Sequence, residues 1–128
     1  LIKDNNLKNR VHIRPYLKSP QTAFLAADVA VVCSLQESIG SVTLEAMASG
    51  RPVVGADSGG TAAMLSHGRG WTFEPGDAAG LAEQLAGLRR RPDDAAPRLK
   101  AAHSLVQAHR RTEVTRRWEN VLGRDGLA

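Results

Sequence analysis

The sequence predicts an α/β domain in which helices cover both faces of a parallel sheet. Short apolar runs of strand length alternate four times with segments of helical spacing, which is typical of this class. Val29–Cys33 is continuously apolar and rich in β-branched residues, as strands buried on both faces are. The 128 residues, 42% of them hydrophobic, suffice for one core. We therefore expect one three-layer domain over residues 1–128.

Four strands are expected, and together they form an incomplete parallel sheet. Each is a short run of apolar residues bounded by turn-forming Gly, Pro, Asp or Ser. The expected strands cover residues 11–13, 29–33, 52–55 and 71–73.

Segments with helical spacing lie between and after these strands. Gly50 suits the left-handed residue that ends a helix over 41–49, in which Val42, Ala46 and Met47 are expected to face inward. Asp77 suits the N-cap position of a later helix. The expected helices cover 22–27, 41–49, 61–65 and 78–90, with one long or two broken C-terminal helices over about 95–122.

Composition argues against several classes of protein. Cys33 is the only cysteine, so no internal disulfide forms, and no Cys or His cluster indicates a metal site. No apolar run approaches the ~20 residues of a membrane helix, and the first residues lack the apolar region of a signal peptide. We therefore expect a cytoplasmic protein.

Positive charge is concentrated in the last third of the chain. Residues 88–128 carry ten Arg or Lys against five Asp or Glu, and the net charge of the whole chain is +4. This pattern fits a solvated helix face, and it also fits contact with an anionic membrane, a nucleic acid or an acidic domain. Nucleic acid is disfavoured, because interleaved aromatic residues and a recognised motif are missing.

The segment from Glu37 to Glu45 is the strongest candidate for a site. It follows a buried parallel strand and leads into a helix, and ligands of open α/β sheets bind at such strand ends. Gly40 permits close approach of a ligand, and the first helical N–H groups, from Ser41 to Thr43, favour a phosphate. Glu37 and Glu45 offer acceptor oxygens to sugar hydroxyls and a ribose diol. Both glutamates also fit a plain surface or capping role.

A longer series of motifs includes this segment. In chain order it reads Ala26-Ala27-Asp28-Val29, Ser34, Glu37, Ile39-Gly40, Leu44-Glu45-Ala46-Met47-Ala48, Gly50, Pro52-Val53-Val54 and Gly59-Gly60. The series resembles the C-terminal nucleotide-sugar-binding domain of retaining GT-B glycosyltransferases of family 4, the glycosyl transferases group 1. The resemblance covers residues 11 to about 90, and it continues more weakly to about 122.

The resemblance implies a Rossmann-like fold and a donor site. Glu37 is then the catalytic carboxylate that contacts the transferred sugar, and Glu45 binds the ribose. The other donor-binding residues that the resemblance implies are Ser38, Ile39, Gly40, Ser41 and Val42, with Arg14, Pro15 and Tyr16 beside the nucleobase. The sequence departs from the family pattern at Cys33, Ile39 and Ala63, where the family commonly has proline, phenylalanine and glutamate.

The same resemblance implies a reaction and a truncation. The reaction transfers a hexose from a nucleoside diphosphate sugar to a hydroxyl acceptor with retention, and it needs no metal or other cofactor. Two central strands and an N-terminal acceptor domain of such enzymes have no counterpart in the chain. We expect a fragment, or a strand at 11–13 that closes up beside 29–33, or a partner over the open edge. The alternative function is a non-catalytic fragment or interaction module. The basic tail suggests a peripheral position at the inner membrane.

Overall fold

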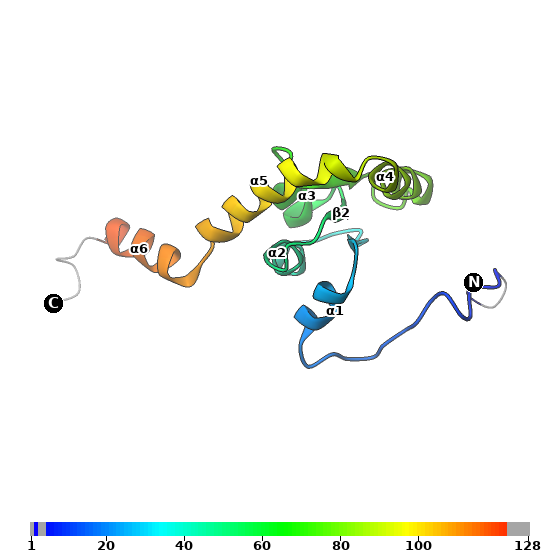
Figure 1. Ribbon diagram of the computed structural model, residues 1–128. Coiled ribbons are helices and arrows are strands. Elements are labelled where there is room, and N and C mark those ends of the chain that lie inside the picture. Colours follow the sequence, from blue (N-terminus) through cyan, green and yellow to red (C-terminus); the bar gives the residue numbers. More distant parts are fainter. Residues whose placement is uncertain (1, 3–4, 123–128) are drawn as a thin grey trace.

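A three-stranded parallel sheet forms the centre of the molecule (Figure 1). The computed structural model describes residue 2 and residues 5–122. Strands β1 (Ala30–Val32), β2 (Val53–Ala56) and β3 (Trp71–Phe73) lie in sequence order, with β2 in the middle. Ala30 pairs with Val53, and Val54 pairs with Trp71. All four residues of β2 are buried, which explains their apolar character.

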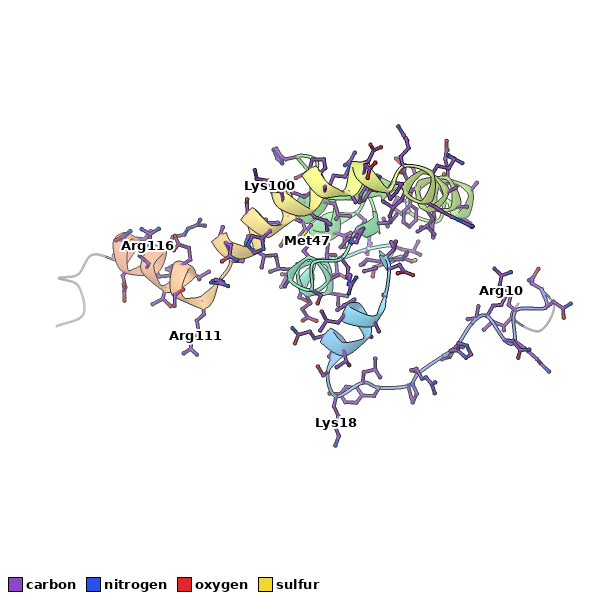
Figure 2. The ribbon with its side chains drawn as sticks, viewed as in Figure 1. Arg10, Lys18, Met47, Lys100, Arg111 and Arg116 are labelled. Carbon is purple, nitrogen blue, oxygen red and sulfur yellow. The ribbon has the colours of Figure 1, made fainter. Side chains whose placement is uncertain are left out.

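Helices cover the two faces of the sheet unequally. On one face, α2 (Ser41–Ala48), α3 (Gly59–Leu65) and α5 (Ala95–Ala108) enclose the larger apolar core, which includes Met47, Leu65 and Ala102. Figure 2 shows Met47 between α2 and α5. The short helix α1 (Pro20–Ala26) adds Phe24 to this core. On the other face, α4 (Ala78–Arg90) packs Leu81 and Leu85 against the smaller core. The predicted three-layer α/β architecture is confirmed.

The predicted signals that begin and end helices are confirmed. The Asp77 carboxylate accepts a hydrogen bond from the Gly80 N–H (3.0 Å) and caps α4. Gly50 adopts a φ of +69° after α2, and its N–H donates to the Met47 carbonyl (3.0 Å). The prediction that Val42 faces inward is wrong. Val42 lies in the first turn of α2 and is 46% exposed.

The prediction of a strand at residues 11–13 is also wrong. This segment is irregular and exposed, and Figure 1 shows it running away from the sheet toward the N-terminus. A strand needs backbone hydrogen bonds to a neighbour. Within the described residues, only β2 pairs with β1, so the segment did not close up beside β1. Ile13 is 78% exposed as a result.

Two helices, not one, form the C-terminal part. A short 3-10 helix (Pro92–Asp94) leads into α5, and residues 109–110 separate α5 from α6 (Arg111–Leu122). Figure 1 shows α6 projecting away from the sheet. Its apolar residues Val114, Trp118 and Val121 are exposed, Trp118 to 60% and Val121 to 77%. The apolar stripe predicted over this region therefore faces the core only in α5.

Candidate functional site

The loop between β1 and α2 ends in a backbone conformation that favours glycine. Gly40, the N-cap residue of α2, is buried and has a φ of +77°, in the left-handed region. Its N–H donates a long hydrogen bond to Oε1 of Glu37 (3.4 Å). The Glu37 carboxylate is therefore turned toward the start of the helix. It keeps its other oxygen as an acceptor.

This loop is locked against the loop between β2 and α3. The Gly60 N–H donates to the Glu37 carbonyl (2.7 Å), and the hydroxyl of Ser58 donates to the Leu35 carbonyl (2.9 Å). A Cβ atom on Gly40 would lie 2.7 Å from the Gly60 carbonyl carbon. A Cβ atom on Gly60 would lie 2.5 Å from the Gly40 nitrogen. The two backbones therefore approach as closely as glycine alone permits.

A buried pair of hydroxyls joins the helices that follow these loops. Oγ1 of Thr43 in α2 and Oγ1 of Thr61 in α3 are hydrogen-bonded at 3.0 Å. Thr43 is 0% exposed and Thr61 is 1% exposed, so water does not replace this bond. The pair fixes the first turns of α2 and α3 side by side at the carboxyl end of the sheet.

The first turn of α2 has unpaired backbone donors. The first intrahelical bond runs from the Leu44 N–H to the Gly40 carbonyl (3.0 Å). In the described part of the chain, the N–H groups of Ser41, Val42 and Thr43 have no acceptor, and no side chain caps the helix. Donors in this position, together with the helix dipole, favour an anion such as a phosphate.

A pocket of about 380 Å³ lies between α2 and the segment that enters α1. Glu45 is exposed on α2 and lines this pocket. Figure 2 shows Lys18 at the bend before α1. The remaining lining residues are Ser19, Pro20, Gln21, Ala48 and Ser49. The lining therefore combines a carboxylate, a lysine and several other polar residues, an environment suited to a polar ligand.

The predicted site residues are only partly brought together. Residues 37–42 gather at the glycine-packed loops, and Glu45 lies on the same helix but in the pocket. Arg14, Pro15 and Tyr16 are exposed and do not line this pocket, and Tyr16 is 82% exposed.

Sequence reasoning did not single out Lys18–Gln21, which form the pocket wall. The available signal was Pro20 directly after Ser19, because proline is common at the first position of a helix and so indicates that a helix begins here. Gly60 was noticed only as part of a motif.

Over residue 2 and residues 5–122, no group of three or more His, Cys, Asp or Glu side chains is placed to hold a metal ion. Across the same part of the chain, no helix has the length and apolar character needed to span a membrane.

The fold and the loop geometry define an α/β domain in which a helix with unpaired N–H groups in its first turn begins at the carboxyl end of a parallel sheet. Comparison with known families identifies it further. Residues 1–91 match the family model described as glycosyl transferases group 1. The chain belongs to this family.

Curated relatives are glycosyltransferases and a synthase. A D-inositol 3-phosphate glycosyltransferase of Mycobacterium avium is 38% identical over 110 residues, 81% of this chain and 26% of the relative. An N-acetyl-alpha-D-glucosaminyl L-malate synthase of Bacillus anthracis is 34% identical over 89 residues, 69% of this chain and 23% of the relative. The chain therefore spans about a quarter of the length of these relatives.

Solved structures of the GT-B class share the fold. Anabaena Alr3699/HepE in complex with UDP superimposes with a TM-score of 0.83 at 27% identity, over 94% of this chain and 34% of that one. The same Anabaena protein in complex with UDP-glucose gives a TM-score of 0.76 at 28% identity, over 82% of this chain and 29% of that one. The predicted Rossmann-like fold and family membership are thereby confirmed. Over the residues that the structure describes, the sheet has three strands where about four were expected.

Proposed function

We propose that this chain is the donor-binding part of a retaining glycosyltransferase. The intact enzyme transfers a hexose from a nucleoside diphosphate sugar to a hydroxyl acceptor. The observation that carries the proposal is the start of α2, where three N–H groups have no acceptor among the described residues and the glycine-packed loops fix the backbone. The similar Anabaena protein was solved with UDP and with UDP-glucose, which supports a donor of this class.

Each part of the site receives one part of the donor. The N–H groups of Ser41 and Val42 bind the diphosphate, with the backbone of residues 38–40 beside it. Glu37 contacts the transferred sugar, and Glu45 accepts hydrogen bonds from the ribose hydroxyls in its pocket. The predicted placement of the nucleobase near residues 14–16 stays a prediction.

Stabilisation of the leaving diphosphate is the main chemical task of the chain. Negative charge builds up on the diphosphate as the bond to the sugar breaks. The N–H groups at the start of α2 and the helix dipole offset this charge without reorganisation, because the two glycine loops already fix them. The diphosphate itself assists removal of the acceptor proton, so this reaction requires neither a covalent nucleophile nor a metal.

An NMR titration of the 128-residue chain tests the proposal. UDP, GDP and ADP, and their glucose or mannose derivatives, are added to wild-type protein, to Glu45→Ala and to Glu83→Ala. Glu83 is an exposed glutamate on α4 and serves as the matched control. Saturable shifts from Gly40 to Glu45 that weaken only in Glu45→Ala support the proposal. A dispersed spectrum without any shift contradicts it and favours the non-catalytic interaction module.

We further propose that α6 contacts an anionic membrane surface. The helix exposes Val114, Trp118 and Val121 beside Arg117, a combination suited to the interface of acidic lipids. Arg116 is hydrogen-bonded to Glu113, and this bond is the main cause that holds the pKa of the Glu113 carboxyl below its ordinary value. Binding to phosphatidylglycerol vesicles that weakens with salt and in Arg117→Gln supports this contact. Equal binding to neutral vesicles contradicts it.

A further inference from the structure

We propose that Arg51 is a positioning residue that holds α1 in place and thereby keeps the shape of the pocket between α1 and α2. The inference rests on the proposed function, because it treats this pocket as the nucleoside end of the donor site. Arg51 does not line the pocket. Arg51 acts through α1, which carries one wall of the pocket.

The backbone of Arg51 is fixed on both sides. Gly50, which precedes it, ends α2 in the left-handed conformation. Pro52, which follows it, accepts a hydrogen bond from the Ala30 N–H (2.9 Å) at the start of the sheet. Arg51 is therefore tied to α2, which carries Glu45, and to β1 and β2 as well.

The side chain of Arg51 reaches the last turn of α1. Its Nη2 donates to the Leu25 carbonyl at 2.6 Å. This carbonyl is one of the last four in α1, which lack intrahelical donors, and a cation at this end of a helix is favourable. Among the described residues, this is the one side-chain hydrogen bond that joins α1 to a distant part of the chain, the segment between α2 and β2.

Little else holds α1 against the rest of the molecule. The helix has seven residues and none of them is buried, although Phe24 packs against the larger core. The pocket wall at residues 18–21 lies at the other end of α1, where Pro20 is about 7.5 Å from Leu25 along the helix axis. A tilt of α1 at Leu25 therefore moves this wall relative to Glu45.

Arg51 is a poor choice for stability alone. Its Nε–H is buried and has no hydrogen-bond partner. An unpaired buried donor lowers stability, and an apolar side chain of similar length avoids this loss. The presence of an arginine at this position is therefore explained by its hydrogen bond to α1 and not by its contribution to stability.

Three variants of the 128-residue chain test this role. Arg51→Met keeps the length of the side chain and removes its donors, whereas Arg51→Lys keeps a charge and a donor. Arg98→Met is the matched control, because Arg98 Nη1 donates to the Gly70 carbonyl (2.5 Å) and its guanidinium lies 4.7 Å from the Trp71 ring centroid, away from the pocket. UDP affinity, thermal stability and amide hydrogen exchange across α1 are measured for each variant.

We expect Arg51→Met to weaken UDP binding by about threefold to tenfold and to speed hydrogen exchange in α1. Arg51→Lys restores most of the affinity. Arg98→Met lowers thermal stability but leaves the affinity within about twofold of wild type. The inference is overturned when Arg51→Met binds UDP as tightly as wild type, or when Arg98→Met loses as much UDP affinity as Arg51→Met.

Hydrogen exchange separates a failure of this inference from a failure of the proposed function. When wild-type chain binds no nucleotide, the proposed function fails. Faster exchange in α1 that is confined to Arg51→Met still supports the positioning of α1. Unchanged exchange in that variant overturns it, whatever the affinity.

Discussion

The two segments that border the proposed donor site are held in place to very different degrees. Residues 37–61 contain the glycine-packed loops and the buried Thr43–Thr61 pair, and their backbones are in direct contact. Residues 9–19 are exposed throughout and carry no regular secondary structure. The phosphate side of the site is therefore built into the core, whereas the segment leading to the nucleoside side is not.

This contrast agrees with the chemistry that the two sides perform. Donors that stabilise a developing charge must be fixed before the reaction, because reorganisation would cost part of their effect. The wall that binds the nucleoside needs only to fit its ligand. A short helix such as α1, fixed at one end, can supply such a wall. We therefore expect substitutions near Gly60 to act on folding and substitutions near Ile13 to leave folding unchanged.

Gly60→Ala should give the largest effect. A methyl group at this position collides with the backbone of Ile39 and Gly40, and neither can move without breaking the loop contact. We expect a loss of about 3 kcal/mol in the free energy of unfolding, measured by urea denaturation.

Gly87→Ala is the matched control for Gly60→Ala. Both glycines lie in helices, but a Cβ atom on Gly87 would meet no atom within 4 Å. We expect this variant to gain about 0.5 to 1 kcal/mol from helix propensity. Similar stabilities of the two variants would show that the loop contact is looser than the structure indicates.

The buried threonine pair should give the next largest effect. Thr43→Val or Thr61→Val leaves one hydroxyl buried without a partner, which lowers the free energy of unfolding by about 1 to 2 kcal/mol. The double variant removes both hydroxyls, so its loss should be smaller than the sum of the two single losses. Thr115→Val, at an exposed position on α6, is the control. Additive losses would contradict a direct bond between the two hydroxyls.

The core of the fold was predictable because its signals are local. Apolar β-branched runs marked β1 and β2, and Asp77 and Gly50 marked helix ends through contacts within a few residues. Residues 11–13 carry the same local pattern, yet they form no strand. Strand formation depends on a partner, and the sequence of the segment itself does not state whether one is present.

The sequence indicated which residue types form the candidate site, but not the long-range contacts that hold these residues in place. The position of Gly40 at the start of α2 follows from the pattern of a strand, a loop and a helix. The contact between Gly40 and Gly60 joins residues that are far apart in the sequence, and so does the bond from Arg51 to Leu25. Such contacts depend on how the loops and helices pack, which hydrophobic periodicity does not encode.

Ile13→Ser should give the smallest effect and tests the other half of the contrast. The side chain is 78% exposed, so a polar replacement loses little burial, and we expect a change of about 0.5 kcal/mol or less in the free energy of unfolding. Val54→Ala, at a position that is 0% exposed in β2, should cost about 2 kcal/mol in the same denaturation experiment. A loss in Ile13→Ser comparable to that of Val54→Ala would mean that residues 9–19 are packed in solution. The nucleoside side would then be as firmly held as the phosphate side, and the contrast between the two segments would fail.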